Sequence, residues 1–395
     1  MEFRRKTAVF FIGMFILIMG SLVHGPASAS AEEDTGPADW TSILQQLDTD
    51  EMDRFQQEVR EELGIQNHFM TTREWLGNFV RGDWNLEGGS LWEQIKQCWF
   101  RMLRQNIHLL GKIIILSVIS ALLVQVENSL QAHTAKFAGI ACHMSIALAA
   151  VLSFQQAWEM GSQAAGRMAD FMNAMLPPMM VLTAGLGNVT SSAVMFPVLM
   201  TTTTAVADGI RVVVLPLAAF SIVLHIVNQL AEGIRVEKLA QFFSQAAQLS
   251  LGFIMTAFVG FITARTLYAS TLDKVLLRTG KFVTDNTIPV VGKMLSDTLE
   301  VAAGYVMVLK NALGIYGVLI LLGLLAVPFM QIVLLAVLYR LGAALVEPLG
   351  DEKTAALLDK IGGSIWFLAA ALASVSLVFF MMIALIVGLT NNFTL

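Results

Sequence analysis

Long apolar runs separated by short polar stretches fill the chain from residue 105 onward. Six of these runs reach about the 18 residues or more that a helix needs to cross a bilayer. They cover residues 107–126, 137–156, 209–230, 246–267, 313–338 and 365–387. The pattern predicts an all-α, polytopic membrane domain, a helical bundle over residues 105–395.

Two further segments, residues 168–200 and 281–314, are apolar but contain helix breakers. The pattern of the first returns 112 residues later in the second, so that Pro289 aligns with Pro177. Proline removes a backbone donor, and in lipid such a break survives only where protein or a wet cavity pairs the freed carbonyls. We therefore predict a duplicated unit with a broken-helix hairpin in each half. The repeat halves fall at about residues 136–245 and 248–360, with a final span at 365–387.

The basic residues predict the sense of this repeat. The positive-inside rule holds best if each broken segment crosses the membrane once, because most of the basic residues near the spans then face the cytoplasm. Each half then has an odd number of crossings, which makes the repeat inverted, an architecture of secondary transporters. If each segment instead re-enters on one side, Lys274, Arg278 and Lys281 lie outside together. The charge count favours the inverted repeat.

The N-terminus is a separate unit. Arg4, Arg5 and Lys6 lead into an apolar run and then a small-residue site at residues 27–31, which is typical of a secretory signal peptide over residues 1–31. An uncleaved anchor helix is the alternative interpretation. Both interpretations place residues 32–104 outside the cytoplasm.

Residues 32–104 are predicted to form a small, acidic, helical extracytoplasmic domain. They hold 15 acidic and 7 basic side chains, whereas residues 105–395 hold 14 and 15. Apolar residues recur at helical spacing, and Thr71 with Glu74 fits a capping box. The acidic balance argues against nucleic-acid binding, which needs a basic footprint.

The sequence contains no catalytic or metal-binding motif: no phosphate-binding loop, no HExxH and no cluster of cysteines and histidines at metal spacing. Cys98 and Cys142 lie on either side of the first apolar run, so no disulfide is expected. His143 and His225 fall within spans, where they either relay protons or hydrogen-bond a neighbouring helix. We predict that the chain is not an enzyme and holds no cofactor or metal.

Polar and ionisable residues around the broken segments form a candidate pathway. Charge at membrane depth is costly, so it usually lines a cavity or pairs. Asp208 and Arg211 are three residues apart and are expected to share a helical face, where they either pair or face the pathway. The threonines at 201–204 are expected to bond back to their own helix. The candidate set is Asn173, Pro177, Thr190, Ser191, Ser192, Asp208, Arg211, Asp285, Pro289, Asp297 and Glu300.

Three stretches, in order and spacing, carry a resemblance to a known family. They read MLPPMMVLTAGLG at residues 175–187, GIRVEKLA at 233–240 and VEPLGD at 346–351. The chain resembles the stage III sporulation protein AE family of endospore-forming bacteria. The resemblance implies a multi-pass subunit of the channel complex that links mother cell and forespore, placed in the mother-cell membrane around the forespore. It implies as partners other stage III sporulation membrane proteins, a secretion-type ATPase and ring-forming subunits.

Two functions therefore stand as hypotheses. The first is a non-enzymatic subunit of that secretion-like channel complex, with partner docking at the second and third stretches. Its candidate docking residues are Glu232, Arg235, Glu237, Glu347, Asp351 and Glu352. Under the inverted repeat, only the loop at 339–363 faces the cytoplasm. The alternative is a secondary transporter that moves a small solute through a site at the bilayer midplane. A third class, an intramembrane enzyme, lacks any motif.

Overall fold

The computed structural model describes the chain with gaps. It covers residues 44–45, 47–64, 70–82, 96–104, 106–108, 111–112, 114–119, 122, 133–186, 189–230, 235–284, 291–349 and 352–388. The backbone alone is described for residues 133–139, 189–194, 230, 262, 265–284, 291–303 and 349. The signal-peptide region, Asp285 and Pro289 lie outside the described residues.

All elements in the described ranges are helical. Two short helices, α3 (Asp50–Leu63) and α4 (Thr72–Arg81), precede the bundle. The bundle consists of α6 (His133–Gly185), α7 (Val189–Asp208), the π-helical turn η1 (Gly209–Val214), α8 (Leu215–Leu230), α9 (Glu237–Thr284), α10 (Val291–Val346), the 3-10 turn η2 (Glu347–Leu349) and α11 (Glu352–Gly388).

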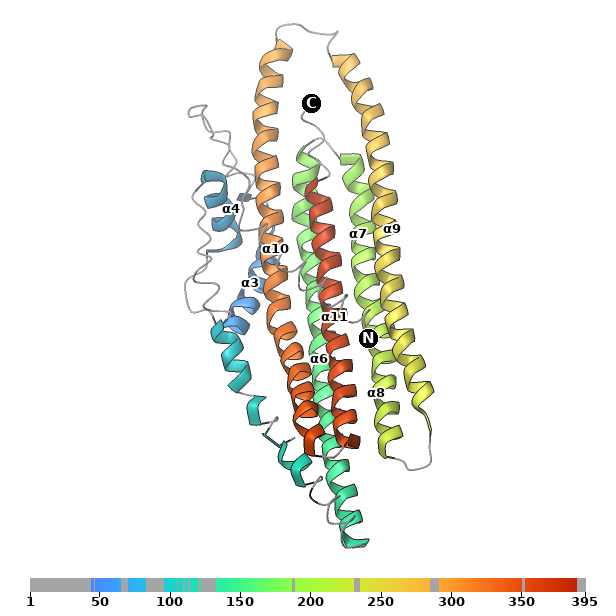
Figure 1. The fold of residues 1–395 in the computed structure, drawn as a ribbon. Helices are drawn as coiled ribbons and strands as arrows, with labels where there is room; N and C mark the ends of the chain where they lie inside the picture. Colours follow the sequence, from blue (N-terminus) through green and yellow to red (C-terminus); the bar gives the residue numbers. More distant parts are fainter. Residues whose placement is uncertain are drawn as a thin grey trace.

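The long helices run side by side as one elongated bundle (Figure 1). Helix α11 lies in its interior, packed against α10, α6 and α8. Helix α9 lies at an edge and packs mainly against α8 and η1. Because α6 and α10 both pack on α11 and on each other, these three helices form the core of the bundle.

Five described helical stretches are long and apolar enough to cross a membrane. They are Ile140–Gly185, Met195–Gln229, Glu237–Phe261, Gly304–Val346 and Glu352–Gly388. Each overlaps one of the predicted spans, so the prediction of an all-α, multi-pass membrane bundle is confirmed. The remaining predicted span, residues 107–126, is described only in short pieces.

The helices are much longer than a bilayer is thick. Helix α6 has 53 residues and α10 has 56. At a rise of 1.5 Å per residue each is about 80 Å long, against a hydrocarbon thickness of about 30 Å. A large part of each rod therefore extends beyond the hydrocarbon layer.

The first broken segment is the tip of a helical hairpin. Pro177 and Pro178 lie inside α6, which continues to Gly185 before the chain turns into α7. Pro178 is buried, and α6 is packed against α7, α10 and α11, so the lost hydrogen bonds lie in a helix held by its neighbours. The prediction placed a break in the right segment, but the glycine end of α6 marks the turn and the prolines do not.

The predicted inverted sense is not confirmed. The end of α6 and the start of α7 lie at the same end of the bundle as the end of α9 and the start of α10 (Figure 1). Both halves therefore rise and return in the same direction. The charge count assumed that each broken segment crosses once, whereas each contributes to a turn between two antiparallel helices.

Helices α3 and α4 pack on α10, and α3 also on α6. The rings of Phe55 and Phe171 meet edge-on with their centroids 5.6 Å apart, and the ring centroids of Trp75 and Tyr316 lie 5.3 Å apart. The Tyr316 and Thr72 hydroxyls lie 2.8 Å apart, and Thr72 Oγ1 donates to Asp53. These contacts hold α3 and α4, which belong to the predicted small helical domain, against α10 and α6.

The start of α4 bears out a local prediction. The Glu74 backbone N–H donates to Thr71 Oγ1 at 3.3 Å, and the Thr71 N–H donates to Glu74 Oε2 at 2.9 Å. This is the predicted capping box, which pairs two of the donors that a helix start leaves open.

Candidate functional site

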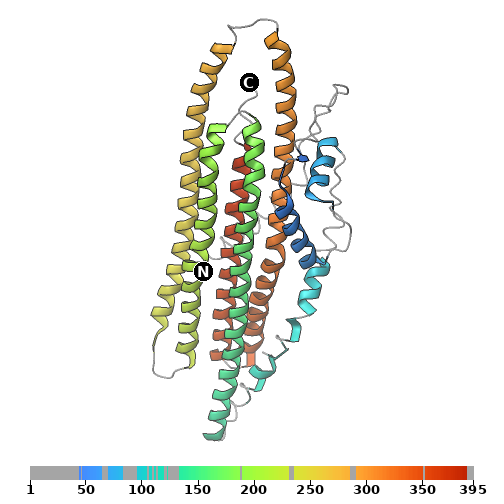
Figure 2. The same cartoon turned by 180° about the vertical axis from the view of Figure 1, so that it is seen from behind.

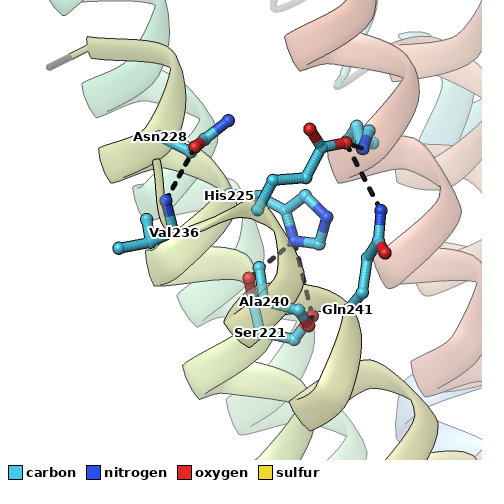
Figure 3. A network of polar contacts seen from close by, with 8 residues as sticks. Ser221, His225, Asn228, Val236, Ala240 and Gln241 are labelled. Carbon is cyan, nitrogen blue, oxygen red and sulfur yellow. Dashed lines mark hydrogen bonds and ion pairs between the residues drawn. The ribbon is translucent and has the colours of Figure 1, made fainter. Parts of the chain in front are cut away.

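The turn between α8 and α9 is held by side-chain hydrogen bonds (Figure 3). Asn228 Oδ1 accepts from the Val236 backbone N–H at 3.0 Å, just before α9 begins. Ser221 Oγ donates to the Ala240 carbonyl at 2.9 Å. The first donors of a helix have no partner within it, so Asn228 acts as a cap supplied by the preceding helix. The described part of the GIRVEKLA stretch, residues 235–240, is thereby fixed against α8.

His225 belongs to the same cluster. Its Nδ1 lies 2.7 Å from the Ser221 carbonyl oxygen. In the tautomer that carries the proton on Nδ1, the ring therefore donates a hydrogen bond to its own helix. The Ser221 hydroxyl is 3.4 Å from the same nitrogen. Figure 3 shows the imidazole ring at the centre of the cluster. Both of these contacts of the ring lie within α8.

An ion pair links α9 to α11. Lys360 Nζ lies 3.3 Å from Glu237 Oε1, which also accepts from Gln241 Nε2 at 3.4 Å. The two side chains are 39% and 53% exposed, and an exposed pair of this kind contributes about 0–1 kcal/mol. The pair therefore sets the position of the α9 start beside α11 more than it stabilises the fold.

The α10–α11 turn lies at the same end of the bundle as the α8–α9 turn (Figure 1). We call this the loop end: residues 235–240, 346–348 and 352–360. Arg235, Glu237, Glu347 and Glu352, four of the six predicted docking residues, are exposed there. Glu232 and Asp351 lie outside the described residues. The expectation that only one of the two loops faces the cytoplasm fails with the inverted sense, because both loops share one end.

Residues that the sequence analysis missed join the loop end to α6. Thr354 Oγ1 lies 2.9 Å from His143 Nδ1, and the buried Tyr339 hydroxyl lies 2.8 Å from Ser153 Oγ. Tyr339 and Thr354 flank the VEPLGD stretch. Tyr339 is a polar side chain in an apolar run, whereas Thr354 follows three charged residues and carried no such signal. His143 thus meets a neighbouring helix.

The candidate pathway residues are spread over the bundle. Asn173 lies on α6 with its Oδ1 buried and without a hydrogen-bond partner, and Pro177 is exposed. Asp297 and Glu300 lie on α10. Thr190, Ser191 and Ser192 lie in the first turn of α7. For these three residues, and for Asp297 and Glu300, backbone alone is described. The groove of about 500 Å³ between η1 and α9 is apolar and includes none of them; it is lined by Gly209, Val213, Leu249, Ser250, Phe253 and Ile254.

Asp208 and Arg211 do not form an ion pair, and both side chains are exposed. Arg211 Nε donates to Ser162 Oγ on α6 at 3.3 Å. The reason is the π-helical turn η1, in which the Leu215 N–H reaches back five residues to the Ile210 carbonyl. This wider turn comes directly before Pro216 and shifts the angular spacing, so residues three apart no longer share a face.

The threonine run behaves as expected. Thr201, Thr202, Thr203 and Thr204 each donate to the carbonyl four residues back, at 2.7–3.1 Å. Cys98 and Cys142 are free thiols. Among the residues whose side chains are described, no three His, Cys, Asp or Glu gather as they would around a metal ion.

Comparison with known proteins agrees with this architecture. Residues 70–390 match the family model described as stage III sporulation protein AE. Stage III sporulation protein AE of Bacillus subtilis (strain 168) is 30% identical over 382 residues, which are 95% of this chain and 96% of that protein. No solved structure matches the chain.

In the residues that the structure describes, the fold defines a multi-pass, all-helical membrane protein whose α8–α9 and α10–α11 turns share one end. Within that class, the match over most of the chain is specific: the chain belongs to the stage III sporulation protein AE family. A role in sporulation follows from that membership.

Proposed function

We propose that this chain is a non-enzymatic membrane subunit of the secretion-like channel complex between mother cell and forespore, required for endospore formation. In this proposal it lies in the mother-cell membrane around the forespore, with residues 32–104 outside the cytoplasm. It forms part of a conduit or anchors the assembly.

The observation that carries the proposal is the loop end. Two stretches far apart in sequence, at 233–240 and 346–351, belong to turns at one end of the bundle (Figure 1). This end holds the pair between Glu237 and Lys360 and the exposed side chains of Arg235, Glu347 and Glu352. Such a surface suits protein docking more than lipid contact, because charge is costly in the hydrocarbon layer. In the proposed topology this end is cytoplasmic, where a secretion-type ATPase can reach it.

The test is a charge reversal at the loop end, Glu347→Lys together with Glu352→Lys. Both side chains are exposed, so the fold and the protein level are expected to hold while spore formation is lost. Glu51→Lys together with Glu61→Lys on α3 is the matched control, a pair of exposed acidic residues outside the loop end. Normal spore counts in the double variant contradict docking at this end.

One observation favours the second candidate, a secondary transporter. Asn173 Oδ1 is buried in α6 without a partner, and an unpaired polar atom inside a membrane bundle is a place where a solute can bind. Solute flux in proteoliposomes that contain this chain alone, lost with Asn173→Leu, supports the transporter. The proposed channel subunit conducts nothing without its partners.

A further inference from the structure

One face of α6 carries exposed polar and charged side chains. Glu159, Gln163 and Asp170 are exposed and follow one another at four and seven residues, so they lie on one face of the helix. Gln163 Nε2 lies 3.5 Å from Glu159 Oε1, whereas Asp170 forms no ion pair with any described side chain. Residues on the opposite face, such as Met168 and Met172, are buried. The polar residues of α6 therefore point away from the core of the bundle.

Helix α7 and the turn η1 extend this surface, because α7 lies beside α6 (Figure 2). Thr204 and Asp208, four residues apart on α7, are both exposed. Arg211 of η1 is exposed and joins the two helices: its Nε donates to Ser162 Oγ, and its guanidinium lies 3.3 Å from a Cβ built at Gly166. We call the combined surface the polar face; its members are Glu159, Gln163, Asp170, Thr204, Asp208 and Arg211.

The polar face lies at the level of the most apolar part of α10. Toward the loop end, a Cβ built at Gly161 lies 3.6 Å from Ile332 Cδ1, and further along the bundle Met175 touches Gly317. Residues 311–339 of α10 contain no Asp, Glu, Lys or Arg. A charge-free stretch of this length is the part of a helix that crosses the hydrocarbon layer. The polar face is therefore at membrane depth.

Helix α3 lies at the same level, and it is more polar still. Eight of its 14 residues are charged. The ring of Phe55 packs on that of Phe171 in α6, and Glu62 forms an ion pair with Arg167 of α6. Charged side chains within membrane segments face the interior of a bundle or a water-filled cavity, because charge in hydrocarbon is costly. The exposed charges of α3 and of the polar face therefore both require water beside them.

The flank formed by α9 is apolar at the same level. A Cβ built at Gly209, next to the polar face, lies 3.2 Å from Ile254 Cδ1 of α9. Leu249 and Phe253 are 76% and 73% exposed, and residues 239–264 contain no charged side chain. This flank suits lipid, whereas the polar face does not. A single molecule surrounded by lipid satisfies only one of the two surfaces, so the polar face needs an aqueous space enclosed by protein.

We propose that several copies of this chain enclose a shared, water-filled passage, with the polar face of each copy toward the passage and α9 toward lipid. Cyclic symmetry turns the same face of every copy toward the axis, so one polar face per chain is enough to line the passage. The carboxylates of Asp170 and Asp208 and the guanidinium of Arg211 stay hydrated there. The passage rests on the proposed function for its cellular role as a conduit, whereas the contact of the polar face with water does not.

Thiol labelling at one level on the two faces tests whether water reaches the polar face. Gln163→Cys on α6 and Phe253→Cys on α9 are each made in the full-length chain with Cys142→Ala, in membranes of sporulating cells opened to both sides. A charged maleimide, which does not enter lipid, is expected to label position 163 and to leave position 253 unlabelled. Both positions are expected to react after denaturation in detergent. Labelling of both positions in the membrane, or of neither, overturns the proposal.

Cross-linking tests whether copies of the chain enclose the passage. Two differently tagged chains that both carry Gln163→Cys are expected to be joined by a bismaleimide with a long flexible spacer, because their polar faces meet across the water. Two chains with Phe253→Cys are the control and are expected to stay separate. Labelling at position 163 without a joined product shows that another protein closes the space, which overturns the shared passage. Neither result depends on docking at the loop end, which the spore counts test.

Discussion

The two hairpins of the bundle share a sequence pattern but pack differently. In the first, α6 and α7 lie against each other after the turn. In the second, α9 and α10 lie on opposite flanks, with other helices of the bundle between them (Figure 2). Helix α10 is buried in the core and α9 is largely open. The repeated apolar pattern thus gives each half a pair of antiparallel helices, while the position in the bundle decides what each copy touches.

The largest effect concerns the shared sense of the two hairpins. Arg235→Cys and Glu352→Cys, in a Cys142→Ala background, are expected to react with an impermeant maleimide from the same side of sealed vesicles. Lys281→Cys is expected to react from the other side. Cys98 stays silent because it is 2% exposed and burial raises the pKa of its thiol, so little thiolate forms until the pH is raised. Labelling of positions 235 and 352 from opposite sides contradicts the shared direction of the two hairpins and supports an inverted repeat.

The next effect is on stability, and it compares the buried contact between α10 and α11 with the open face of α9. A Cβ at Gly362 of α11 lies 3.2 Å from the Ala336 carbonyl oxygen and 3.3 Å from the Arg340 backbone nitrogen of α10. Gly362→Leu is therefore expected to lower the free energy of unfolding by about 1–3 kcal/mol. The thermal unfolding midpoint in one detergent measures it. Gly252→Leu on open α9 is the matched control, and an equal loss there contradicts the contrast between the two helices.

A smaller effect is expected at the cap that fixes α9 to α8. Asn228→Ala removes the acceptor of the Val236 N–H and is expected to cost about 1 kcal/mol, the usual value of a lost helix cap. Hydrogen exchange of the first amides of α9 should accelerate. Gln229→Ala is the control, and equal exchange in the two variants shows that the hydrogen bond does not hold the turn.

The smallest effect belongs to the ion pair between α9 and α11. A double-mutant cycle with Glu237→Ala and Lys360→Ala is expected to give a coupling energy of about 0–1 kcal/mol that shrinks as salt is added. Both partners are partly exposed, so water screens them. A coupling well above this range, unaffected by salt, contradicts a positioning role.

The spans were predictable from sequence because an apolar run of this length in lipid has few alternatives to a helix. The capping box at Thr71 and the back-bonded threonines were predictable for a related reason, since each depends only on neighbours within four residues. What failed depends on contacts between distant segments. The position of α11 inside the bundle and the shared end of two loops follow from helix packing, which no local pattern encodes.

In the candidate site, too, local features were predictable and contacts between distant segments were not. Exposed charges in the GIRVEKLA and VEPLGD stretches mark polar turns, but their common location required the direction of α9 and α10. The supposed pair of Asp208 and Arg211 failed because the spacing rule holds for a regular helix, whereas η1 is π-helical ahead of Pro216. The wider turn at Gly209–Val214 changed which residues face each other.

The interior position of α11 has a consequence for biosynthesis. Helices α6, α8 and α10 all leave the ribosome before the helix that they surround. At about 5–20 residues per second, the roughly 40 residues from the end of α10 to the end of α11 take about 2–8 s to be made. During that interval the faces of α6, α8 and α10 that pack on α11 still lack it, so the core of the bundle is completed only by the last helix to be made.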